Sequence, residues 1–175
     1  MQFVCVTDGD PNMDYLDPAA AQAFIDMIHE AYYKRMPDAF GPVITHTFYD
    51  EVTIYRAQGR VWTPRFNEIY EERYGSNPIL FYPALWYDIG PETQAARNAL
   101  FTLRSDLYAE AYPQAITRWS REHKTIATGH QDNEEIVNPV GTSGDLMKCF
   151  RYLEMPGIDK IGTTRPTITR PAEKF

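Results

Sequence analysis

The sequence has few cysteines, no basic run and no long apolar segment. Only Cys5 and Cys149 occur among 175 residues, which excludes the disulfide framework of a small secreted domain. The net charge is -7 and Lys and Arg form no cluster, so we expect neither a nucleic acid nor an anionic membrane as partner. No window approaches the roughly 20 apolar residues of a membrane span.

The start of the chain, MQFVCVTDGDP, lacks the basic region and apolar run of a signal peptide. We therefore expect no export signal in this chain. Its localisation stays open, and a longer parent protein could be periplasmic or secreted.

Several catalytic motifs are also missing. There is no HExxH zinc motif, and no glycine-rich loop of the kind that holds phosphate. GTSGD, residues 141–145, has Asp145 where the nucleophile elbow GxSxG requires glycine. These absences argue against a zinc protease, a phosphate-binding fold and a serine hydrolase.

The residues that are present suit a globular α/β protein. Hydrophobic residues make up 43% of the chain, enough to bury a core. Aromatic residues make up 14%, which is typical of carbohydrate sites, where rings stack on sugars, and equally of an ordinary core.

Strands and helices are predicted to alternate along the chain. Strands are predicted over 2–7, 41–51, 124–129 and 156–162. Helices are predicted from the cap Asp17 to just before Pro37, over 64–74 with Gly75 as C-cap, over 92–123 with a break at Pro113, and over 143–154. The proline-interrupted segment 76–90 is predicted to be irregular or briefly helical, near the ends of the strands.

This order is typical of βαβ units with parallel strands. Four strands are too few for an eight-stranded barrel, which takes about 250 residues. The chain is thus either a small open α/β domain or part of a larger (β/α)8 barrel. Because acidic residues follow two of the strands, we predict a partial (β/α)8 barrel of TIM type over 1–162 and an irregular tail over 163–175.

The first acidic pair, Asp50 and Glu51, ends the predicted strand 41–51. Carboxylates at the mouth of a barrel are partly buried, which allows one to hold a proton near neutral pH. The alternative is structural: Asp50 would cap the loop and Glu51 would pair with a nearby arginine.

A second group follows the strand 124–129 in TGHQDNEEIVNP: His130, Asp132, Glu134 and Glu135. One carboxylate could act on a substrate while another, with Asp132, holds Ca²⁺, which prefers oxygen ligands. The alternative is a solvated acidic loop. Two carboxylates from different strand ends are the minimum apparatus of glycoside hydrolysis, in which one protonates the leaving oxygen and the other attacks or activates water.

Several longer stretches of the chain resemble one family. PNMDYLDPAAAQAFIDMIHEAYYKRM, the strand ending FYDE, YPALWYDIGPETQAARNALF and TGHQDNEEIVNPVGTSGDLMKCFRYLEMPGIDKI look like parts of the catalytic barrel of the large α-L-rhamnosidase-like glycoside hydrolases. The resemblance covers residues 11–162. It implies a (β/α)8 barrel, hydrolysis of a terminal sugar such as α-L-rhamnose with inversion of configuration, and a calcium ion near the sugar.

The resemblance also implies roles for individual residues. Glu51, Glu134 and Glu135 become the catalytic candidates, and Asp132 and Glu134 the calcium ligands. Substrate-binding candidates are Asp50, His130, Trp86, Tyr87 and Asp88.

Two other interpretations remain. The chain could be a truncated, non-catalytic piece that binds carbohydrate or calcium, or a truncated product with no function of its own. A partial barrel also leaves strand edges open, through which it could self-associate.

Overall fold

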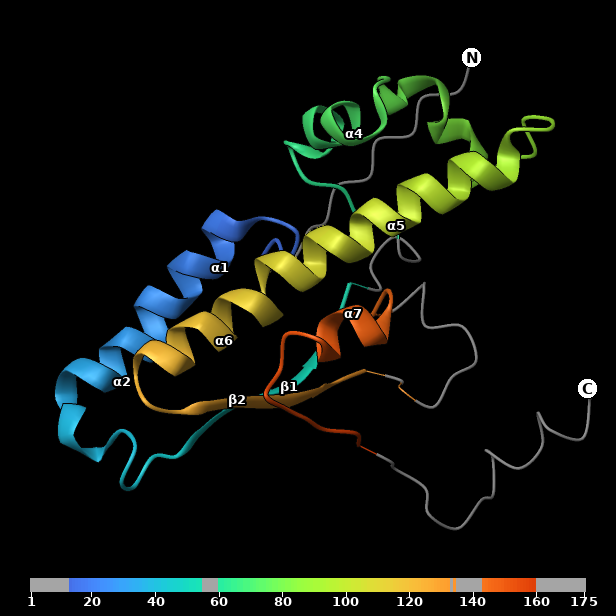
Figure 1. The fold of residues 1–175 in the computed structure, drawn as a ribbon. Coiled ribbons are helices and arrows are strands. Elements are labelled where there is room, and N and C mark those ends of the chain that lie inside the picture. Colours follow the sequence, from blue (N-terminus) through green and yellow to red (C-terminus); the bar gives the residue numbers. More distant parts are fainter. Residues whose placement is uncertain (1–12, 55–59, 133, 135–142, 160–175) are drawn as a thin grey trace, which may run out of the picture.

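The computed structural model describes residues 13–54, 60–132, 134 and 143–159 (Figure 1). The elements in chain order are α1 (Pro18–Phe24), the π-helix η1 (Ile25–His29), α2 (Glu30–Arg35), the 3-10 turn η2 (Pro37–Ala39), β1 (His46–Val52), α4 (Phe66–Tyr74), the 3-10 turns η3 (Pro78–Leu80) and η4 (Tyr82–Leu85), α5 (Thr93–Ala111), α6 (Pro113–Glu122), β2 (Ile126–Gln131), α7 (Leu146–Phe150) and β3 (Met155–Pro156). In the described ranges, no helix combines the length and apolarity of a membrane span.

The predicted helix boundaries are confirmed at several caps. The Asp17 carboxylate accepts a hydrogen bond from the Ala19 N–H at 2.9 Å, and Pro18 begins α1. Gly75 ends α4 in the left-handed conformation, with φ at 75°. Asp145 caps α7 through the Met147 N–H.

Pro113 divides the long helical region as predicted. Proline has no N–H to donate to the preceding turn, so α5 ends at Ala111 and α6 begins at Pro113 itself. The two helices still follow one another as a single bent column, which crosses the whole molecule in Figure 1.

The strands form a parallel sheet in the order β1-β2-β3. Helix α6 packs against β2, while α1 and α7 each pack against both α5 and α6. The core between sheet and helices is apolar and includes Tyr49, Ala127, Leu103, Leu107, Tyr108, Ile116 and Trp119. Burying these side chains supplies most of the driving force for folding.

The opposite face of the sheet is exposed. Phe48 is 62% exposed, Met155 48% and Ile126 37%. All described helices lie on the other side of the sheet in Figure 1. The two faces therefore differ: one packs against helices, and the other presents apolar and polar side chains outward.

Three predicted elements are shorter or shifted. The strand predicted over 41–51 begins only at His46, because the segment after Gly41 turns back and the Gly41 N–H donates to the Ile44 carbonyl. The helix predicted over 143–154 is confined to Leu146–Phe150. Among the described residues, the strand predicted over 156–162 pairs with β2 at Met155 and Pro156, and the Gly157 N–H continues this ladder by donating to the Gly129 carbonyl at 2.8 Å.

The α/β class and the parallel pairing are confirmed, whereas the predicted partial barrel of TIM type is not shown. The described residues form a three-stranded parallel sheet with helices on one side. The predicted strand 2–7, the end of the predicted barrel region at 160–162 and the predicted tail 163–175 lie outside the described residues.

Candidate functional site

An irregularity in the β1–β2 pairing carries the first two acidic residues. Tyr49 pairs with Gly129 and Val52 with Gln131, so β1 has one residue more than β2 over this stretch. This is a β-bulge, and it leaves Asp50 and Glu51 exposed while Val52 returns to the core. Glu51 has a φ of 46°, a left-handed conformation that costs free energy in a residue with a side chain.

His130 lies between two carboxylates. Its Nε2 is 2.8 Å from Oδ1 of Asp50, and its Nδ1 is 3.4 Å from Oε1 of Glu134. The ring also lies beside Phe48, with centroids 5.8 Å apart. The sequence predicted a loop at His130, but β2 continues through Gln131, so the histidine is held by the sheet itself.

The surroundings of His130 favour its charged form. Burial opposes the charge, but the Gln131 carbonyl and the carboxylates of Glu134 and Asp50 outweigh it, so the pKa of His130 is raised above its ordinary value. A charged His130 attracts the Asp50 carboxylate on β1 and the Glu134 carboxylate that follows β2.

Glu134 differs from the other two acids because its side chain is only 4% exposed. Burial raises the pKa of the Glu134 carboxyl, although its backbone hydrogen bonds and His130 oppose the shift. Its Oε1 is buried and has no hydrogen-bond partner among the described residues. A carboxyl of this kind is suited to hold a proton and donate it.

A buried polar network supports the site from the core side. The Gln131 Nε2 donates to the Tyr49 hydroxyl at 2.6 Å, and the Tyr108 hydroxyl donates to the Val52 carbonyl at 2.7 Å. Tyr108 also contacts Oε1 of Gln131. Sequence analysis missed this network, which ties the ends of β1 and β2 to helix α5.

The segment with Trp86, Tyr87 and Asp88 does not lie at the strand ends. It follows η4 beside the start of α5, away from the ends of β1 and β2 (Figure 1). The Asp88 carboxylate accepts hydrogen bonds from the Gly90 N–H and the Thr93 hydroxyl, which stabilises the start of α5. Arg97 binds the Ala84 and Tyr87 carbonyls.

The remaining predicted site residues lie close to the cluster in sequence. Asp132 follows β2, and its backbone carbonyl accepts a hydrogen bond from the buried Ser143 hydroxyl at 2.8 Å. This bond holds the start of the α7 region against the end of β2. Glu135 lies outside the described residues.

Asp50, Glu51 and His130 could together bind a cation. One ligand atom from each lies within 4.8 Å of the other two. This set differs from the predicted pair of Asp132 and Glu134. The two carboxylates suit Ca²⁺, whereas Nε2 of His130 suits a softer ion such as Zn²⁺.

Comparisons with known proteins give a likeness of fold. No family model matches the sequence, and no curated protein matches it either. Among solved structures, the chain is similar to the rhamnosidase from Novosphingobium sp. PP1Y, with a TM-score of 0.62 and 18% identity. The similarity covers 80% of this chain and 13% of that chain. This chain therefore has a rhamnosidase-like fold over a small part of the length of that protein.

Proposed function

We propose that this chain forms part of the catalytic domain of a glycoside hydrolase that removes a terminal sugar, with α-L-rhamnose as the first candidate. The supporting observation is that Asp50, His130 and Glu134 meet at the carboxyl ends of two neighbouring parallel strands. In (β/α)8 barrels this end of the sheet carries the active site. A partial barrel of this type agrees with the rhamnosidase-like fold.

The proposed roles follow from exposure and charge. Buried Glu134, whose pKa is raised, is suited to protonate the leaving oxygen. Exposed Glu51 is suited to activate water for attack with inversion, and Glu135 remains a further candidate. His130 would orient the acids on either side of it, and Asp50 would contact the sugar.

Glu51→Gln is the direct test. We expect the chain to release nitrophenol from an aryl α-L-rhamnoside, and the substitution to slow this by about 10³-fold because the general base is lost. Glu68→Gln is the matched control, since Glu68 is exposed on α4 and forms an ion pair with the neighbouring Arg65. Equal turnover by the two variants would remove Glu51 from the mechanism.

A second candidate function is binding of carbohydrate or calcium without catalysis. The observation that favours it is the cluster of Asp50, Glu51 and His130. If the chain binds rhamnose but releases no nitrophenol, this alternative holds. If it does neither, the proposed catalysis and the binding of rhamnose are both excluded, and calcium binding is tested separately.

Calcium binding has its own expected result. At about 100 times its Kd, Ca²⁺ should stabilise the chain by about 2.7 kcal/mol, because it binds only the folded state. Thermal unfolding with CaCl2 and with EDTA measures the difference, and ZnCl2 tests for use of the His130 nitrogen. Asp50→Asn should abolish the shift, while Asp38→Asn, at an exposed position in η2, should preserve it. A shift that survives Asp50→Asn would place the ion elsewhere.

A further inference from the structure

A groove on the helical side of the molecule is lined by more basic than acidic side chains, although the protein as a whole is acidic. It has a volume of about 530 Å³, within the usual range of small-ligand sites. One wall is a face of α6, and the other is the chain just after α7. The lining residues are Gln114, Thr117, Arg118, Arg121, Glu122, Arg151 and Tyr152.

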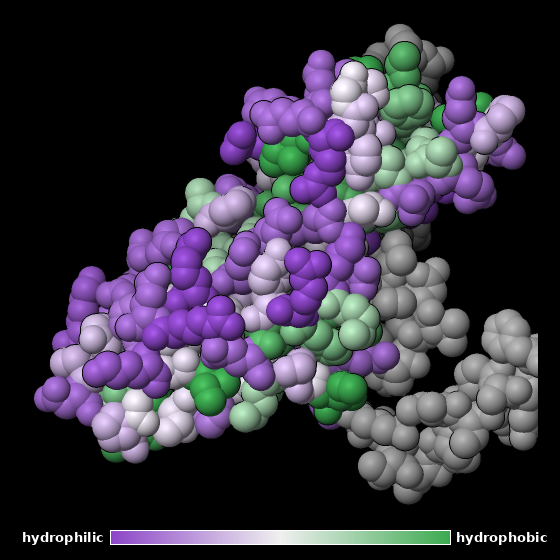
Figure 2. All heavy atoms as spheres, in the orientation of Figure 1, coloured by the Kyte–Doolittle hydropathy of each residue, from purple (hydrophilic) through white to green (hydrophobic). Residues whose placement is uncertain are grey.

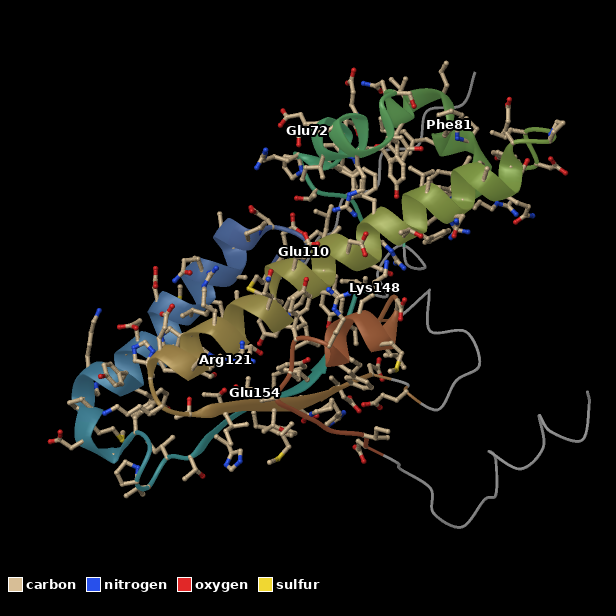
Figure 3. All side chains as sticks on the ribbon, in the orientation of Figure 1. Glu72, Phe81, Glu110, Arg121, Lys148 and Glu154 are labelled. Carbon is tan, nitrogen blue, oxygen red and sulfur yellow. The ribbon has the colours of Figure 1, made fainter. Side chains whose placement is uncertain are left out.

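Three guanidinium groups converge on this groove. Arg118 and Arg121 lie one turn apart on α6, and Arg151 follows α7. Figure 3 shows Arg121 beside Glu154, whose carboxylate it binds at 2.7 Å. Hydrophilic side chains dominate this face over α6 (Figure 2).

Two of these three arginines have no carboxylate partner among the described residues. Arg151 stacks on the Tyr152 ring, with its Cζ 5.8 Å from the centroid, and Arg118 forms no ion pair there. Yet the chain has 24 acidic residues against 17 basic ones. Glu122 also lines the groove, but with Arg121 bound to Glu154, two guanidiniums face this single carboxylate.

Thr117, one of the residues that line the groove, has a buried hydroxyl group. Thr117 is 3% exposed, and its Oγ1 has no hydrogen-bond partner in the described part of the chain. A buried hydroxyl without a partner costs free energy in the folded state, and it is a donor for any ligand oxygen that reaches it.

We propose that this groove binds an oxyanion, a carboxylate or a phosphate group, between Arg118 and Arg151. The planar guanidinium presents paired donors that match the oxygens of both groups. The groove lies on the helical face rather than at the strand ends, so its ligand is distinct from the sugar of the proposed reaction.

The test is an NMR titration of the full chain at low salt that follows the arginine side-chain resonances. The probes are sodium phosphate and sodium galacturonate, with galactose as the neutral counterpart of galacturonate. We expect the anions to shift the Arg118 and Arg151 signals and galactose to leave them unchanged. Binding of one anion alone would identify its source as a phosphate or a carboxylate, and high salt should weaken it.

Substitutions locate the site. Arg118→Gln and Arg151→Gln should each weaken binding about tenfold, because each removes a charged hydrogen-bond donor. Arg65→Gln, an exposed arginine on a different helical segment, should leave it unchanged. Glu51→Gln should also bind normally, which separates this site from the proposed active site.

Two results would overturn the proposal. One is that neither anion shifts the arginine signals at low salt. The other is that all three arginine variants weaken binding equally, which would indicate a general charge effect. Thermal unfolding of each variant shows whether it is folded. Arg118 and Arg151 are exposed, so they can be replaced without disturbing the core.

Discussion

Gly129→Ala is expected to destabilise the protein by about 3 kcal/mol. A Cβ at this position would lie 2.5 Å from the Tyr49 carbonyl oxygen and 2.9 Å from its Cγ. Both atoms belong to Tyr49 on the paired strand β1, so β1 and β2 would have to move apart directly beside Asp50 and His130. Urea unfolding of the two proteins measures the loss.

Gly90→Ala is the matched control for this prediction. Gly90 also has a positive φ, of 104°, but a Cβ there meets no atom within 4 Å. Its replacement should cost only the backbone penalty, about 1 kcal/mol. If the two substitutions cost the same, the contact with Tyr49 is not what requires glycine at position 129.

Gln131→Ala should cost a similar amount, about 3 kcal/mol. The side chain is fully buried and binds the Tyr49 and Tyr108 hydroxyls. Its removal leaves a cavity and a Tyr49 hydroxyl without its amide partner, and each of these destabilises the folded state. Urea unfolding again gives the value.

Gln94→Ala is the control for this second substitution. Gln94 is exposed on α5, and its replacement should change stability by less than about 0.5 kcal/mol. A loss below about 1 kcal/mol for Gln131→Ala would mean that water or a shifted side chain replaces the missing amide.

The features of the fold that could be predicted are those set by residues close together in the sequence. Asp17 before Pro18, Gly75 after a helical pattern and Pro113 within one each have a single strong physical effect on the backbone. The apolar runs at β1 and β2 likewise predicted strands, and the alternation of strands with helices predicted their parallel pairing. These signals depend on neighbours in sequence, so they can be interpreted without knowing the fold.

The candidate site was predicted in part. Acidic residues at strand ends led to Asp50 and Glu51, and the motif around His130 led to Glu134. Residues four apart, such as His130 and Glu134, ordinarily meet on one face of a helix. The structure instead forms this contact from the end of β2 and the turn that follows.

Other features depend on tertiary contacts and could not be predicted from local patterns. Trp86 and Tyr87 resemble sugar-stacking residues in composition, but Arg60 and Arg97 hold their segment beside α5. The Gln131 network joins residues 23 and 82 positions apart. The bulge did leave a signal: Tyr49 and Val52 are three residues apart, although alternation would place inward residues two apart.

The extra residue in β1 determines which side chains of the strand face the core after the bulge. Before it, Thr47 and Tyr49 face the core; after it, Val52 does. Without the bulge, the same residues would alternate regularly, and Val52 would turn outward with everything that follows it. Replacing Glu51 by another residue leaves this inward and outward pattern of β1 unchanged. The bulge therefore gives β1 one exposed position more than regular alternation allows, while Val52 keeps its place in the core. The exposed side chain at position 51 can differ without changing which residues of β1 are buried.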